Sequence, residues 1–112
     1  MKKIEAIIRP EKLEAVRQAL EKVDSPGLMI TEIEGHGKQK GITQQWRGRK
    51  YKVELLAKVK IEIVVKDQDA EGVIKAISEA AKTGKIGDGK IFVYPIGDAL
   101  RIRTDERGDK AI

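Results

Sequence analysis

Two short segments in the carboxy-terminal third of the chain contain residue types that bind phosphate. The first, Thr83-Gly84-Lys85-Ile86-Gly87-Asp88-Gly89-Lys90, has three glycines that let backbone N–H groups approach a ligand closely, and a lysine that can meet a phosphate. It is not a Walker A loop, which needs a different spacing and a Ser or Thr after its lysine. For the glycines alone, a helix end at Gly84 followed by a glycine turn is the simpler interpretation.

The second segment, Arg101-Ile102-Arg103, changes that balance. Residues two apart in an extended segment share a face, so both guanidinium groups would point the same way. Guanidinium groups on one face can hold phosphate oxygens in bidentate fashion. An arginine pair by itself is usually a solvated face, but the two segments together favour a phosphate-binding site.

The basic character of the chain is confined to one segment. The net charge is +5, yet residues 38–52 carry six basic side chains and no acidic one, so the rest of the chain is close to −1. These side chains are Lys38, Lys40, Arg47, Arg49, Lys50 and Lys52. The clustering favours contact with anions or with the carbonyl groups of a partner over a loop that is merely solvated.

The composition excludes several classes of protein. With 112 residues, 40% hydrophobic and 37% charged, the chain suits one folded domain over residues 1–112. There is no cysteine for a disulfide or a thiol nucleophile. We find no apolar run near 18 residues and no signal-peptide pattern at the first residues, so we expect a cytoplasmic protein.

The elements that must position these segments follow from hydrophobic periodicity. Apolar residues alternate in some segments and recur at helical spacing in others, where Pro10 suits a first helical turn and Asp67 or Asp69 can cap a helix. We predict strands at residues 3–8, 28–34, 55–66 and 90–96, and helices between Pro10 and Ser25 and over 70–81. The order βαββαβ predicts an α+β, ferredoxin-like fold. Residues 35–54 form a loop of unusual length, which suggests that the loop has a function.

Two other classes share this element order. A small hydrolase of the acylphosphatase type is disfavoured because the chain has no Asn, no Cys and only one His, His36. An RNA-recognition module is disfavoured because it stacks bases on sheet aromatics, whereas the strand at 55–66 is aliphatic and charged. We therefore expect no enzyme activity and no nucleic-acid partner.

The chain resembles the PII nitrogen-regulatory signal-transduction proteins over essentially its whole length. Residues 83–96 match that family's carboxy-terminal signature position for position. Residues 35–41 resemble the start of its T-loop, and Arg101-Ile102-Arg103-Thr104 with Glu106-Arg107-Gly108 resembles its closing segment. The resemblance implies a homotrimer with a T-loop at about 36–54, a glycine-rich nucleotide loop at 82–90 and a carboxy-terminal segment at 97–112.

The resemblance also implies ligands: ATP or ADP held between neighbouring subunits, and 2-oxoglutarate sensed beside Mg-ATP. It assigns to the nucleotide site Met29, Gly35, Gly37, Lys38, Val64, Thr83, Gly84, Gly87, Asp88, Gly89 and Lys90, with Arg101 and Arg103 from the adjacent subunit. It assigns to the 2-oxoglutarate site Arg9, Gln39, Lys40, Gly41 and Lys58. Gln39 is also the implied Mg²⁺ ligand, and an amide oxygen suits that hard cation.

The resemblance implies a regulator of a target protein, either an ammonium transporter or a soluble enzyme of nitrogen metabolism, that meets a membrane only through a transporter. In the transporter-regulating branch an arginine near the T-loop tip enters the pore mouth, and Arg47 beside Gly48 and Trp46 matches it. This sequence departs from the family at Met29, where Thr is usual, and at His36, where Phe is usual. Tyr51 matches the residue uridylylated in parts of the family, but Arg49 and Lys50 replace its small and acidic neighbours.

Overall fold

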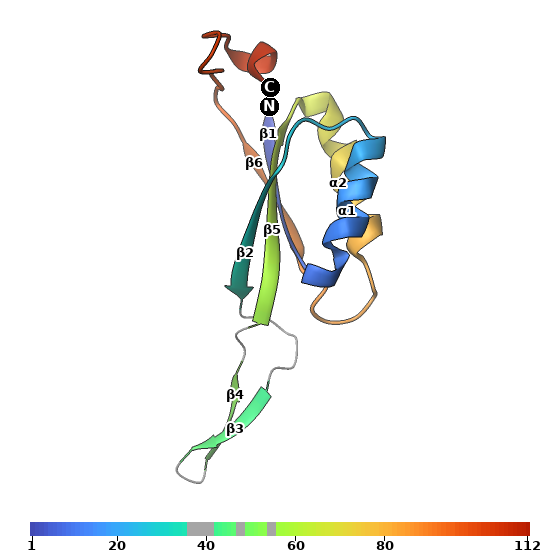
Figure 1. Cartoon of the computed structure of the whole chain (residues 1–112), viewed down its shortest axis with the longest axis vertical. Coiled ribbons are helices and arrows are strands. Elements are labelled where there is room, and N and C mark those ends of the chain that lie inside the picture. The colour runs from blue at the N-terminus through green and yellow to red at the C-terminus, as the bar shows by residue number, and fades with distance from the viewer. Residues whose placement is uncertain (36–41, 47–48, 54–55) are drawn as a thin grey trace.

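The structure is a computed structural model that describes residues 1–35, 42–46, 49–53 and 56–112. Four strands form one antiparallel sheet in the order β2-β5-β1-β6, and two helices cover one of its faces (Figure 1). The strands of this sheet are β1 (Lys2–Ile8), β2 (Met29–Gly35), β5 (Leu56–Val65) and β6 (Lys90–Pro95). The helices are α1 (Leu13–Lys22) and α2 (Ala70–Ala81). This arrangement confirms the predicted α+β, ferredoxin-like class.

The alternation read from the sequence explains which sheet face is buried. Ile4 of β1 lies between Ile63 of β5 and Val93 of β6, and residues at every second position share that face. The helices add their apolar stripes to it. The buried residues are Ile4, Ala6, Ile8, Val16, Leu20, Val59, Ile61, Ile63, Val65, Ala70, Val73, Ile77 and Ala81. The opposite face of the sheet has no helix over it in the described structure (Figure 1).

The helix starts differ in part from the prediction. Pro10 lies in the first turn, as expected, within the 3-10 turn η1 (Pro10–Lys12) that precedes α1. Asp69 occupies the N-cap position of α2, as one of the two expected residues, but neither Asp67 nor Asp69 makes a side-chain capping bond. A second 3-10 turn, η2 (Asp67–Asp69), begins the helix instead, and the Asp67 carboxylate pairs with the amino terminus at 2.9 Å.

The segment between β2 and β5 is more structured than the long loop predicted from the sequence. It contains a two-stranded antiparallel sheet of β3 (Ile42–Trp46) and β4 (Arg49–Val53). Figure 1 shows this hairpin beyond the end of the four-stranded sheet. The Cα radius of gyration is 17.1 Å, whereas a compact chain of this length has about 13 Å. The hairpin therefore stands away from the domain.

The segment after β6 folds back on itself at the opposite end of the sheet from the connection between α2 and β6 (Figure 1). Its ends are held by the bridge between Leu100 and Arg107 and by the bond from the amide of Gly108 to the carbonyl of Ala99, 3.0 Å. A last 3-10 turn, η3, covers Gly108–Ala111. Within the described ranges, neither helix has the length and apolarity that a membrane span requires.

Candidate functional site

The connection between α2 and β6 is a turn that only glycine can build. Gly84, Gly87 and Gly89 all have positive φ, at 84°, 103° and 100°. At Gly89, a side-chain Cβ would lie 1.7 Å from the carbonyl oxygen of Ile7. The turn therefore packs its backbone directly against the end of β1, which is the close approach that the glycine pattern suggested. Helix α2 itself ends earlier than Gly84, at Ala81.

The carboxylate of Asp88 holds this turn together. It accepts hydrogen bonds from the Thr83 hydroxyl, from the amides of Thr83 (2.8 Å) and Gly84 (2.9 Å), and from Arg9 Nε (3.2 Å). The Thr83 hydroxyl bond, followed by these amide bonds and Arg9, holds the pKa of Asp88 well below its usual range. Both oxygens of Asp88 are thus engaged within the turn, and the contribution of this residue to a ligand site would come from its backbone.

Two cations hold the outer side of the same turn. Arg9 Nη2 donates to the carbonyl of Ile86 at 2.8 Å, and Lys58 Nζ donates to the carbonyl of Gly87 at 2.6 Å. Burial lowers the pKa of Lys58, and the neighbouring Arg9 charge acts in the same direction. The structure therefore brings Arg9 and Lys58 together, as the family resemblance implied, and places both against the glycine-rich turn.

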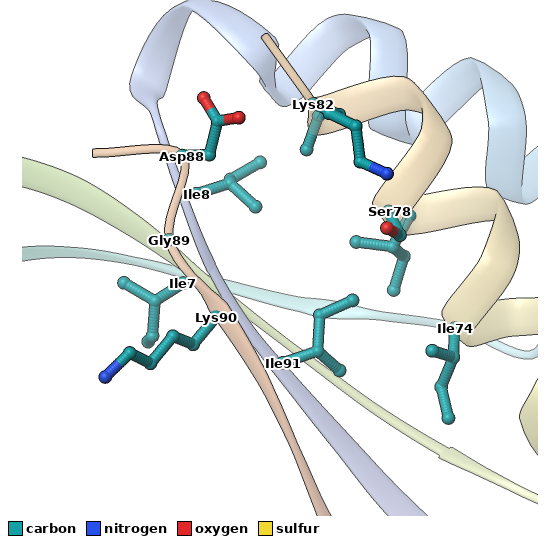
Figure 2. Close-up of a pocket in the computed structure, with 11 residues that line it drawn as sticks. Ile7, Ile8, Ile74, Ser78, Lys82, Asp88, Gly89, Lys90 and Ile91 are labelled. Atoms are coloured by element: carbon teal, nitrogen blue, oxygen red, sulfur yellow. The ribbon is translucent and has the colours of Figure 1, made fainter. Parts of the chain in front are cut away.

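The open face of the sheet gathers three of the predicted nucleotide residues. Lys90 pairs with Ile7, Val64 pairs with Lys3, and Met29 pairs with Glu62. Directly paired residues share a face, and all three pairs lie opposite the buried core. Figure 2 shows the Lys90 side chain pointing away from the helix side of the sheet, toward which Ile91 points. A ligand on the open face would meet the ammonium group of Lys90 beside the glycine turn.

A hollow of about 310 Å³ lies on the other side of this turn, under α2 (Figure 2). Its lining is mostly aliphatic and also includes Ser78, Lys82, Asp88, Gly89 and the backbone side of Lys90. The Lys90 ammonium group is directed away from it. This hollow therefore does not combine the lysine and the glycine amides that a phosphate would need.

The paired arginines do not have the predicted geometry. Residues 101–106 form a turn, in which the amides of Thr104 (3.2 Å) and Asp105 (2.8 Å) donate to the carbonyl of Arg101. Residues two apart in such a turn do not face each other, so the expectation of an extended Arg-x-Arg face was wrong. Arg101 pairs with Glu106 at 3.3 Å. The segment that carries Arg101 and Arg103 lies beyond the far end of β6, about 17 Å along the strand from Lys90.

Several predicted site residues lie outside the described residues. They are Gly37, Lys38, Gln39, Lys40, Gly41, Arg47 and Gly48. Gly35 lies at the end of β2, and Trp46 and Tyr51 lie in the β3–β4 hairpin. Among the described residues, no group of three or more His, Cys, Asp or Glu side chains could hold a metal ion.

Sequence reasoning missed a charged network on the open face. Lys3 bonds to Glu62 at 3.2 Å and lies over the Tyr94 ring, 4.6 Å from its centre, and the Tyr94 hydroxyl donates to Glu5 at 2.6 Å. The alternation of Lys3 and Glu5 with Ile4 indicated a polar face. It did not show which strands would be neighbours, because pairing between β1, β5 and β6 is long-range.

Comparison with known proteins shows one family along the chain. A family model described as Nitrogen regulatory protein P-II matches residues 1–106. Nitrogen regulatory protein P-II of Rhodospirillum rubrum is 56% identical over 112 residues, with 100% of both chains covered. Nitrogen regulatory protein P-II 2 of Methanothermobacter thermautotrophicus is 54% identical over 112 residues, covering 100% of this chain and 97% of its own. Nitrogen regulatory protein P-II of Rhizobium meliloti is 54% identical, with 100% of both chains covered.

Proposed function

Because the chain belongs to the nitrogen regulatory protein P-II family, we propose that it is a sensor that binds ATP or ADP and 2-oxoglutarate and regulates a target protein through its T-loop. Signalling and nitrogen regulation come from the family. The ligands and the target are the proposal, and each has its own support in the residues.

The glycine-rich turn is the observation that carries the nucleotide site. Positive φ at Gly87 and Gly89 leaves successive backbone amides available to an anion. Within the part of the chain that the structure describes, the amides of Gly87 and Asp88 have no hydrogen-bond acceptor. Lys90 follows at once on the open face, where Val64 and Met29 supply apolar surface for a base. These features suit a polyphosphate joined to an aromatic base.

The site would need a second copy of the chain to be complete. The segment after β6, which carries Arg101 and Arg103, lies at the far end of the sheet from the glycine-rich turn (Figure 1), so these arginines would not close the nucleotide site of their own chain. A neighbouring subunit could supply them, which agrees with the homotrimer that the family resemblance implies. Arg103 makes no ion pair among the described residues, whereas Arg101 would exchange Glu106 for a phosphate.

The 2-oxoglutarate site would lie at Arg9 and Lys58, the two cations against the turn. A dicarboxylate suits this charge, and Gln39, Lys40 and Gly41 would complete the site from the T-loop. Gln39 would hold Mg²⁺ through its amide oxygen, and the cation would offset the negative charge of the ligands there. The regulated target would be an ammonium transporter, reached by Arg47, Gly48 and Trp46 in the cytoplasm.

Calorimetry on the purified chain tests this proposal. We expect 2-oxoglutarate and Mg-ATP to tighten each other by about 1 to 3 kcal/mol, and Gln39→Ala to remove most of that coupling. Gln68→Ala is a matched control, because Gln68 is exposed in η2, on the described part of the chain. Equal 2-oxoglutarate binding with and without Mg-ATP would contradict the coupled site, and no binding of ATP or ADP would contradict the sensor.

A further inference from the structure

Two neighbouring peptide groups of the glycine-rich turn are held from the same side. The carbonyl of Ile86 accepts from Arg9 at 2.8 Å, and the carbonyl of Gly87 accepts from Lys58 at 2.6 Å. Arg9 is itself fixed, because its Nε bonds to Asp88 and its side chain is only 13% exposed. The two cations therefore set the orientation of both peptide planes.

The opposite edge of each peptide plane carries an N–H group. In a planar trans peptide the C=O and the following N–H point in opposite directions. The bonds to Ile86 and Gly87 therefore turn the amides of Gly87 and Asp88 away from Arg9 and Lys58. Those amides donate to no acceptor within the described chain, so they remain available to an anion.

We propose that Arg9 and Lys58 are positioning residues for the phosphate-binding amides of Gly87 and Asp88. Each cation pulls a carbonyl to the outer side of the turn and thereby points an N–H at the place where a phosphate oxygen sits. This role rests on the proposed nucleotide site and deepens it, since it does not require either side chain to touch the nucleotide.

Through the same hydrogen bonds, binding of 2-oxoglutarate would affect the nucleotide site. A carboxylate that pairs with Lys58 competes with the Gly87 carbonyl for the same ammonium group. Binding of the dicarboxylate then alters the hydrogen bond that orients the Asp88 amide. Coupling between the two ligands follows from the turn itself, in addition to any contribution of a shared metal ion.

The test measures ATP and adenosine affinity in the absence of Mg²⁺ and 2-oxoglutarate, where direct contact of Arg9 with the dicarboxylate has no influence. We expect Arg9→Ala to weaken ATP by at least about tenfold and adenosine much less, because only ATP carries the phosphates. Arg17→Ala, an exposed arginine of α1 that pairs with Glu14, is the matched control and should leave both affinities unchanged.

Arg9→Lys separates orientation from charge, since a lysine keeps the charge but lacks the fork that reaches both Ile86 and Asp88. We expect it to restore ATP affinity only in part and to shift the amide NMR signals of Gly87 and Asp88. If Arg9→Ala does not fold, this variant carries the test. Full ATP affinity in folded Arg9→Ala or Arg9→Lys would overturn the positioning role while leaving the sensor intact, whereas an unaltered chain that binds no ATP would overturn both.

Discussion

At the scale of single residues, the glycine-rich turn depends on glycines, which have no side chain to clash, and on side chains that hold it by hydrogen bonds. Gly89 brings backbone against the Ile7 carbonyl, and Thr83, Arg9 and Asp88 then tie the turn in one shape. A site of this kind is built from oriented amides, so small changes in backbone geometry should affect the ligand more than the fold.

Gly89→Ala should destabilise the chain by about 2 kcal/mol or more, because a Cβ would lie 1.7 Å from the Ile7 oxygen in a conformation with φ of 100°. Gly97→Ala is the control, since a Cβ there meets nothing within 4 Å. Urea unfolding monitored by circular dichroism measures both free energies of unfolding. Equal stabilities for the two variants would show that the turn can move away from β1.

Asp88 should make the free energy of unfolding depend on pH under acidic conditions. Its pKa is lowered in the folded state, so the unfolded chain binds more protons and the stabilisation is present above the usual aspartate pKa of about 3.9. It is lost as the pH falls toward the lowered value. Melting temperatures of the unaltered chain and Asp88→Asn should therefore differ at pH 7, and the difference should shrink as the pH falls below about 3.9. A melting-temperature difference that stays constant with pH would show that ionisation of Asp88 does not cause it.

At the scale of elements, the four-stranded sheet with its helices and the β3–β4 hairpin are distinct parts of the chain. The four-stranded sheet and its helices form one core, while the β3–β4 hairpin lies beyond the end of β2 and β5 (Figure 1). Since β2 and β5 pair up to Gly35 and Leu56, the sheet can remain intact when the intervening residues change position.

Replacing residues 42–53 by a short Gly-Ser linker should therefore leave the melting temperature within a few degrees of the unaltered chain. Pull-down of a cognate ammonium transporter should be lost in the same variant, because the proposed contact residues are removed. A large fall in melting temperature, measured by calorimetry, would show that the hairpin supports the core.

Arg47→Ala should weaken the transporter complex strongly if its guanidinium, with five donors, meets carbonyl groups of the pore. The same pull-down at increasing 2-oxoglutarate with Mg-ATP should show release of the unaltered chain, and Arg17→Ala should behave like the unaltered chain. If Arg47→Ala binds the transporter equally well, a soluble enzyme of nitrogen metabolism becomes the target to test.

At the scale of the whole molecule, the sheet face opposite α1 and α2 has no helix over it in the described structure (Figure 1). Phe92 and Tyr94 lie on it and are partly exposed, among the paired charges of Lys3, Glu5 and Glu62. A chain of 112 residues has a modest core of its own, so covering this face in a homotrimer would add stability as well as complete the nucleotide site.

Phe92→Glu should dissociate the proposed trimer, because it places a charge on the open face. Val23→Glu is the matched control, since Val23 is 42% exposed at the end of α1 and Phe92 is 43% exposed. Sedimentation equilibrium compares each variant with three times the 12.5 kDa chain mass. A trimeric Phe92→Glu chain, or an unaltered chain that sediments as a monomer, would contradict this interface.

The sequence by itself determined the order of the two helices and of the four strands of the main sheet, the buried faces of β1 and β5, and the glycine-rich turn. Each follows from local periodicity or from backbone conformations that only glycine adopts. It did not predict the β3–β4 hairpin. The family resemblance grouped Arg9 with Lys58 in a 2-oxoglutarate site and assigned Asp88 to the nucleotide site. Only the tertiary structure showed that Arg9 and Lys58 hold carbonyls of the turn and that Arg101 and Arg103 lie at the opposite end of the sheet in a turn. These relations depend on long-range strand pairing and on hydrogen bonds between residues far apart in the chain, which periodicity does not contain.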